Sequence, residues 1–144
     1  YVLLHTFSHL LIRSLAKMCG YQSASLKERI YSTYPSGENM AGILIYTASS
    51  DVEGSLGGLA AQGKSEYLEK IIDDLLDEAE WCSGDPLCMT STGINGQGLY
   101  GLNYAACHQC TLLPETSCTM RNLLLDRAAL IGRTEDGTVG FFIL

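Results

Sequence analysis

Five of the six cysteines in this 144-residue chain lie between Trp81 and Cys118, and this cluster constrains the fold more than any other feature. A C-x2-C turn brings two sulfurs close enough to share one metal ion, and a second cysteine pair from elsewhere in the chain can complete a tetrahedron. Such a site has no open coordination position for water, so it acts as a structural clamp. The spacing therefore predicts a zinc site that binds Zn2+ through Cys82, Cys88, Cys107 and Cys110.

Cys118 is the surplus member of the cluster, and it is either an alternate ligand or a thiol beside the ligands. His108 lies inside the C-x2-C turn, where its ring is expected to donate to a sulfur or to face water. Disulfides, a redox pair and free buried thiols are the alternatives to zinc. A chain of this length can form a core without disulfides, and no thioredoxin-like strand and helix pattern precedes Cys107.

Composition predicts one domain over residues 1–144, because 47% hydrophobic residues suffice for a core. The net charge of −7 disfavours binding of nucleic acid by this chain alone, since such a surface repels phosphate. No apolar run is long enough to span a membrane and no basic flank marks a signal peptide, which favours a cytoplasmic location. The apolar character of both chain ends favours a segment of a longer polypeptide.

The pattern of the elements predicts an α+β fold, with a small antiparallel sheet packed against two or three helices and one four-cysteine zinc knot. The first twenty residues have apolar side chains at helical spacing, with Gly20 as the stop. A hairpin follows, with strands expected at 29–34 and 42–48, although LKER before the first strand could also continue a helix. A glycine-rich loop is expected over 49–64.

The second half is predicted to begin with a helix that has Ser65 as its N-cap, runs to about Glu80 and places an acidic face in solvent. The acidic face could alternatively contact a basic partner. An exposed loop is expected from Cys88 to Asn103, a second amphipathic helix over about 119–130, and a last strand in the tail TVGFFIL.

A second metal site is an open alternative, because His5 and His9 are four residues apart and share one helix face. Asp51 and Glu53, at the entrance of the glycine-rich loop, could join them in acid and base chemistry. The residue after the first histidine is Thr6, where the zincin motif requires glutamate. A structural role is favoured for the two imidazoles, in which they hydrogen-bond neighbouring segments.

Several motifs in fixed order resemble the MrfA zinc-binding domain family, from His5 to about Leu130. They are HTFSHLLIRSL, CGYQSASLKERIY, GILIYTASSDVEGSLGGL, WCSGDPLC and NYAACHQCTLLPETSC followed by NLLLDR. This family occurs at the C-terminus of some DEAD/DEAH-box helicases and in DrmB, a component of the DISARM anti-phage system. The motifs DPLC, AACHQC and PETSC are closer to the DrmB form, and the long insertion between the cysteine pairs departs from the helicase form.

The resemblance implies a zinc module that works beside a superfamily 2 helicase on DNA, and it maps the family's paired cysteines onto Cys82 and Cys88, then Cys107 and Cys110. It implies no catalytic residue, and the segment has no phosphate loop. The favoured interpretation is therefore a non-catalytic accessory module of a DISARM-type complex that contacts the helicase and helps position DNA. The alternative is a metal-dependent hydrolase or nuclease that uses His5, His9, Asp51 and Glu53.

Overall fold

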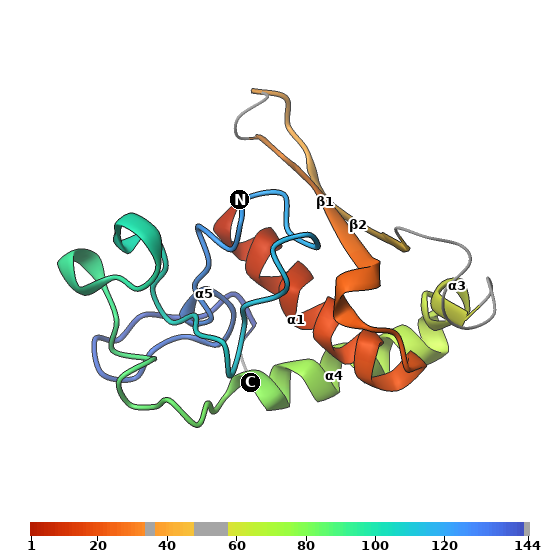
Figure 1. Ribbon diagram of the computed structural model, residues 1–144. Coiled ribbons are helices and arrows are strands. Elements are labelled where there is room, and N and C mark those ends of the chain that lie inside the picture. Colours follow the sequence, from red (N-terminus) through yellow and green to blue (C-terminus); the bar gives the residue numbers. More distant parts are fainter. Residues whose placement is uncertain (34–36, 48–57, 143–144) are drawn as a thin grey trace.

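A computed structural model describes residues 1–33, 37–47 and 58–142 (Figure 1). The main elements in chain order are α1 (Val2–Cys19), β1 (Leu26–Ser32), β2 (Ala41–Thr47), α3 (Gly58–Gln62), α4 (Ser65–Ala79) and α5 (Ala128–Ile131). The strands form a two-stranded antiparallel sheet, which confirms the α+β class. None of the helices in these ranges is long and apolar enough to cross a membrane.

Helix α1 lies at the centre of the molecule, between the β1–β2 hairpin and α4 (Figure 1). It ends as its sequence predicts, since Gly20 has a φ of 72°, the left-handed conformation that closes helices. Its apolar side chains Leu10, Ile12 and Leu15 pack with Leu26 of β1 and with Ile71 and Leu75 of α4. The same helix also buries His5, Thr6, Ser8, His9 and Ser14, so part of its buried surface is polar.

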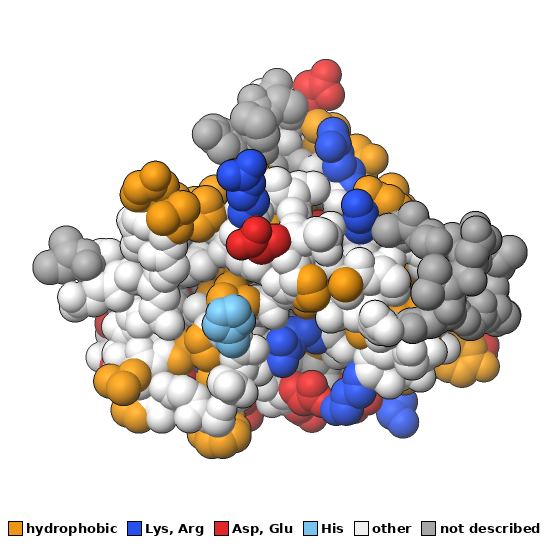
Figure 2. Space-filling view, viewed as in Figure 1, with side chains coloured by type: hydrophobic (Ala, Val, Ile, Leu, Met, Phe, Trp, Pro, Cys, Tyr) orange, Lys and Arg blue, Asp and Glu red, His pale blue; other side chains and the backbone are white. Residues whose placement is uncertain are grey.

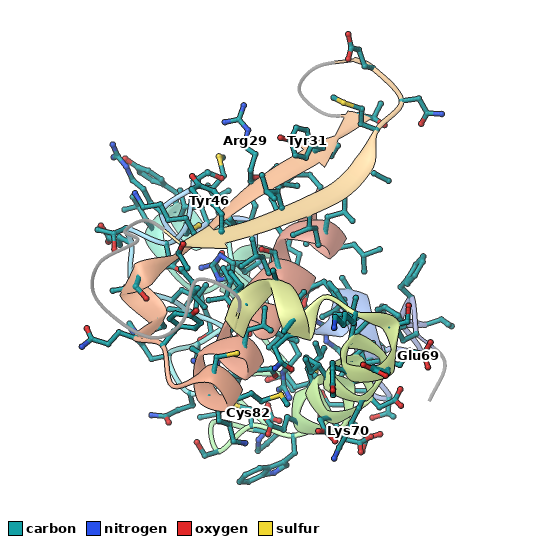
Figure 3. All side chains as sticks on the ribbon, turned by 90° about the vertical axis from the view of Figure 1, so that its right-hand side faces the viewer. Arg29, Tyr31, Tyr46, Glu69, Lys70 and Cys82 are labelled. Carbon is teal, nitrogen blue, oxygen red and sulfur yellow. The ribbon has the colours of Figure 1, made fainter. Side chains whose placement is uncertain are left out.

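The hairpin pairs Leu26 with Thr47 at one end and Ser32 with Ala41 at the other. The first strand begins at Leu26, three residues earlier than expected, so LKER belongs to the strand and does not continue a helix. Alternation along β1 buries Leu26 and Glu28, whereas Arg29 is exposed and points away from α1 (Figure 3). Because β1 begins at Leu26, Glu28 is part of the strand and its carboxylate points toward α1.

Helix α4 begins one residue earlier than an N-cap at Ser65 would place it, because Lys64 occupies the cap and Ser65 is the first helical residue. Its apolar side is buried in the core through Ile71, Leu75, Leu76 and Ala79. Acidic and basic side chains share the surface over α4 (Figure 2), where Lys17 Nζ lies 2.6 Å from Glu78 Oε1. The acidic face is therefore solvent-exposed and partly neutralised by α1.

Three of the expected elements differ from the structure. Gly58–Gln62 forms the short helix α3, so the expected loop over 49–64 is helical there. The expected helix over 119–130 is a series of turns, with helix only at Ala128–Ile131, because Arg121, Asn122 and Leu124 have positive φ angles that no α-helix accommodates. The tail makes one isolated bridge, between Arg133 and Thr138, and residues 138–142 form no strand.

Candidate metal centre

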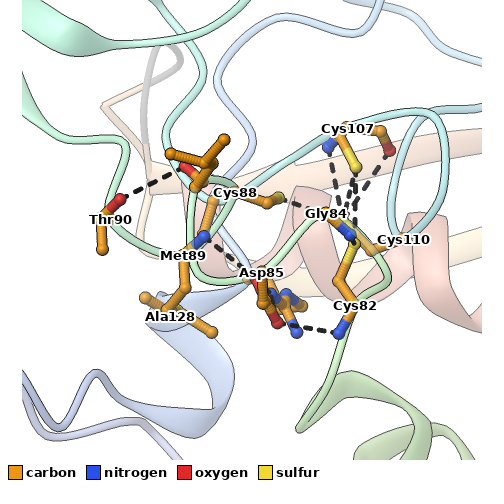
Figure 4. Close-up of polar contacts among 12 residues, drawn as sticks. Cys82, Gly84, Asp85, Cys88, Met89, Thr90, Cys107, Cys110 and Ala128 are labelled. Atoms are coloured by element: carbon orange, nitrogen blue, oxygen red, sulfur yellow. Dashed lines mark hydrogen bonds and ion pairs between the residues drawn. The ribbon is translucent and has the colours of Figure 1, made fainter.

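Four cysteine sulfurs converge where the loop after α4 meets the C-x2-C turn (Figure 4). The ligand atoms of Cys82, Cys88, Cys107 and Cys110 all lie within 4.8 Å of one another. The Sγ–Sγ distances are 3.5 Å for Cys82–Cys107, 3.8 Å for Cys88–Cys110 and 3.7 Å for Cys107–Cys110. A tetrahedron with Zn–S bonds of about 2.3 Å has edges of roughly 3.8 Å. The four thiols therefore fit one Zn2+ ion.

Hydrogen-bond donors from the surrounding chain are directed at these sulfurs. The Gly84 N–H donates to Cys82 Sγ at 3.3 Å, and the Cys107 N–H donates to Cys110 Sγ at 3.4 Å. The Thr111 hydroxyl donates to Cys110 Sγ at 3.2 Å. Donors of this kind stabilise the thiolate form that a metal requires and orient each ligand.

The pKa values of the thiols differ because each sulfur has different neighbours. The hydrogen bond from Cys88 lowers the pKa of Cys110 to about 4, whereas the pKa of Cys88 is raised by the same bond. Burial raises the pKa of Cys82 to about 11. The hydrogen bond between Cys88 and Cys110 therefore favours the thiolate form of Cys110, which is the form that binds a metal.

Asp85 holds the Cys82–Cys88 loop in shape through its carboxylate. The N–H of Cys82 donates to Asp85 Oδ2 at 2.8 Å, and the N–H of Met89 donates to Oδ1 at 3.1 Å. Arg127 also donates a hydrogen bond to this carboxylate. Its Nη1 donates to the carbonyl oxygen of Ala79, at the end of α4, at 2.7 Å. The ligand loop is thereby joined to α4 and to the start of α5.

The long segment between the cysteine pairs is attached directly to the cluster. Gln97 donates from Nε2 to the carbonyl oxygens of Cys88, at 3.4 Å, and of Tyr104, at 2.8 Å. Its backbone pairs with that of Asn103 in an isolated antiparallel bridge. The turn between them exposes Leu99 by 60% and Tyr100 by 83%. As the sequence predicts, this segment is largely solvent-facing, although Asn103 at its end is buried.

All six cysteines are free of disulfides, and Cys118 lies apart from the four-sulfur cluster. It groups instead with His5, His9 and Glu28, whose ligand atoms are also within 4.8 Å of one another. Cys118, the expected alternate ligand, therefore lies in a different cluster from the other four cysteines. His108 is exposed, as expected for a ring facing water.

The histidine pair contacts neighbouring segments, as predicted, because His5 and His9 are fully buried and face the backbone carbonyls of Leu124 and Thr111. The proposed acidic partners Asp51 and Glu53 lie outside the described residues. Glu28 is the group that the sequence analysis did not identify. The signal was present, since a strand starting at Leu26 places Leu26 and Glu28 on the same inward face.

Comparison with known proteins agrees with this geometry. The family model described as "MrfA Zn-binding domain" matches residues 7–111, which include all four clustered cysteines. The chain is 46% identical over 142 residues to the DISARM protein DrmB of Bacillus paralicheniformis (strain ATCC 9945a / NCIMB 11709 / CD-2). This alignment covers 99% of the chain and 24% of that relative, so the chain spans about a quarter of its length. The chain belongs to the MrfA zinc-binding domain family.

Proposed function

We propose that this chain is a non-catalytic zinc module of a DISARM-type defence complex, in which Cys82, Cys88, Cys107 and Cys110 bind one Zn2+ ion. The convergence of these four thiols, in a chain 46% identical to a DISARM protein, is the observation that supports the proposal most strongly. Four thiolates fill the tetrahedral coordination of zinc and leave no position for water or substrate. The ion's role here is to hold the segments around residues 82–88 and 107–110 together.

Contact with a partner protein, which we take to be a superfamily 2 helicase, is assigned to the segment between the cysteine pairs. Its exposed apolar side chains Leu99, Tyr100 and Leu102, together with Leu87 just before Cys88, are called here the insertion surface. Hydrophobic side chains stand out in Figure 2 on the side where Figure 1 shows this segment. Exposed apolar groups held on a fixed backbone are typical of protein interaction sites, and tyrosine is enriched among their energetic centres.

The zinc cluster gives the insertion surface its fixed position. Gln97 links the segment to the carbonyl of Cys88, and the Gln97–Asn103 bridge closes the turn that carries Tyr100. A segment ordered before binding loses less conformational entropy when a partner docks. Zinc thereby supports recognition through structure, without taking part in a reaction.

DNA is positioned by the complex in this proposal, and not by the chain alone. Sixteen acidic residues against nine lysines and arginines give the chain its net charge of −7. DNA binding depends on cations that neutralise phosphates, so a basic partner surface has to supply them. The acidic face of α4 suits contact with such a surface.

The test is co-purification and DNA binding with the full-length protein and a superfamily 2 helicase from the same organism. We expect the helicase to co-purify with the wild-type protein, and the pair to bind DNA more tightly than the full-length protein alone at the same salt concentration. Loss of the helicase from the Leu99→Ser, Tyr100→Ser double variant, with retained zinc, would support the assigned surface. A helicase that never co-purifies, or nuclease activity that disappears with zinc, would overturn the proposal.

A further inference from the structure

The second cluster, formed by His5, His9, Glu28 and Cys118, is buried as completely as the core. The exposed fraction is 0% for both histidines, 1% for Glu28 and 8% for Cys118. The four residues come from the first half of α1, from β1 and from the segment before α5. Polar groups in such a position require partners that compensate for the water they have lost.

The hydrogen bonds on the outer side of both rings leave each Nε2 atom directed into the cluster. His9 Nδ1 lies 3.1 Å from the carbonyl oxygen of Thr111, and His5 Nδ1 lies 3.4 Å from that of Leu124. A carbonyl oxygen only accepts, so each Nδ1 is the protonated nitrogen and Nε2 of the neutral ring bears a lone pair. This is the arrangement in which a metal-binding histidine is held by a backbone carbonyl.

On the inner side of the cluster, the lone pairs of both rings and the Glu28 carboxylate then meet with only the Cys118 thiol hydrogen to share among them. His5 Nε2 lies 3.0 Å from Glu28 Oε1 and 3.1 Å from Cys118 Sγ. His9 Nε2 lies 3.6 Å from the same carboxylate oxygen and is a buried atom with no hydrogen-bond partner. Protonating both rings would place two cations, with centroids 4.6 Å apart, beside a single carboxylate in a buried site.

A divalent cation bound among these four residues accepts their lone pairs and balances their negative charge. Zinc bonds of about 2.0 to 2.3 Å to N, O and S ligands give tetrahedral edges of roughly 3.3 to 3.8 Å, close to the distances found here. One Zn2+ ion with a glutamate carboxylate and a cysteine thiolate is electrically neutral, whereas two imidazoliums with one carboxylate are not.

The remaining ligands are also held from outside, as expected for a metal site. The N–H groups of Met120 and Asn122 donate to Cys118 Sγ at 3.3 and 3.2 Å. The Ser8 hydroxyl donates to Glu28 Oε2 at 2.5 Å, on the side of the carboxylate away from His5 and His9. These contacts orient the thiolate and the carboxylate toward the imidazoles.

We propose that His5, His9, Glu28 and Cys118 form a second, closed site for a divalent transition metal, with zinc as the preferred ion. The site joins α1, β1 and the segment that leads to α5, three parts of the chain that the four-cysteine cluster does not connect. His5 and Cys118 lie outside the residues matched by the family model, which are 7–111. The site adds a structural clamp and provides no open position for catalysis.

The test compares the metal content of matched variants of the full-length protein, all purified without added metal. Ions bound at other sites contribute equally to every variant, so they do not affect the difference from wild type. Cys118→Ala and His9→Gln are each expected to lose about one zinc ion per chain relative to wild type. Cys19→Ala and His108→Gln are the controls, because neither residue belongs to a cluster, and both are expected to retain the wild-type content. Equal metal content in all five proteins would overturn the proposal.

Anomalous diffraction at the zinc edge from wild-type crystals covers the case in which a variant fails to fold. A peak between His9 Nε2, Glu28 Oε1 and Cys118 Sγ, separate from any peak among the four cysteines, is expected. Its absence would refute the second site and leave the four-cysteine site unaffected, whereas a peak only at the second site would refute the zinc knot instead.

Discussion

Nη2 of Arg127 donates to both carboxylate oxygens of Asp85, at 2.7 and 2.8 Å, and the arginine side chain is completely buried. Burial acts to lower the pKa of Arg127, but the hydrogen bond and charge of Asp85 raise it overall. Because Asp85 also accepts from the backbone of the Cys82–Cys88 loop, this pair connects the hydrophobic core to the metal ligands.

Arg127→Ala is therefore expected to lower the free energy of unfolding by about 3 to 5 kcal/mol, because it leaves Asp85 without its partner. Urea denaturation followed by circular dichroism measures the change. Lys70→Ala is the control, since this exposed cation on α4 can be removed with little effect. An equal loss from both variants would contradict the assigned role of Arg127.

Two of the residues that organise the region after Cys110 are asparagines. The Leu113 N–H donates to Asn122 Oδ1 at 3.0 Å, and Asn122 Nδ2 donates to the Leu113 carbonyl at 2.7 Å. Asn103 Nδ2 donates to the Asn122 carbonyl at 2.6 Å. Asn122 has a φ of 59°, a conformation that asparagine tolerates better than most residues.

Asn122→Gly tests these side-chain bonds without adding backbone strain, because glycine accepts a positive φ. We expect the protein to lose roughly 1 to 3 kcal/mol for each unsatisfied backbone group of Leu113. Asn39→Gly, at an exposed position, is the control. Thermal unfolding of the three proteins gives the comparison, and a stability equal to wild type would show that the Leu113 bonds contribute nothing net.

The parts of this fold that follow from local patterns could be predicted from the sequence. Apolar spacing and Gly20 define α1, and the spacing of the cysteine pairs indicates four residues whose sulfurs do converge. The helix expected over 119–130 is absent because side chains outside this segment bind its backbone: Cys118 accepts from the Asn122 N–H at 3.2 Å, and Asn103, which is distant in sequence, accepts from the Leu125 N–H at 3.1 Å. Apolar periodicity does not report such tertiary hydrogen bonds.

The second cluster illustrates the same limit. The spacing of His5 and His9 indicates a shared helix face, but their partners Glu28 and Cys118 are 19 and 109 positions beyond His9. Only the start of β1 at Leu26 directs Glu28 inward, and only the turns after Cys118 bring its sulfur to α1. Boundaries of strands and turns are the least reliable part of a sequence-based prediction.

Removal of the metal is expected to unfold the region between residues 82 and 110, because zinc binding at sites formed only on folding contributes folding free energy directly. Cys110→Ser is expected to lose most of the folded state, and a strong chelator to have a similar effect on wild type. Cys19→Ser, outside both clusters, is the control. A melting temperature of Cys110→Ser equal to that of wild type would contradict a structural role for this ligand.

The insertion surface gives a prediction that separates partner binding from stability. Tyr100 is 83% exposed on the turn anchored to Cys88, so Tyr100→Ala removes contact area for a partner and little that the fold needs. At the centre of an interface, truncation of such a tyrosine costs about 2 kcal/mol or more in binding free energy. Tyr67→Ala on α4, exposed by 47%, is the matched control.

Affinities for the helicase are measured by calorimetry on the full-length protein. A loss with Tyr100→Ala at unchanged melting temperature and zinc content would locate the contact beside the cysteine cluster, because a folding defect would change all three quantities together. Equal affinities for both variants would exclude Tyr100 from the contact.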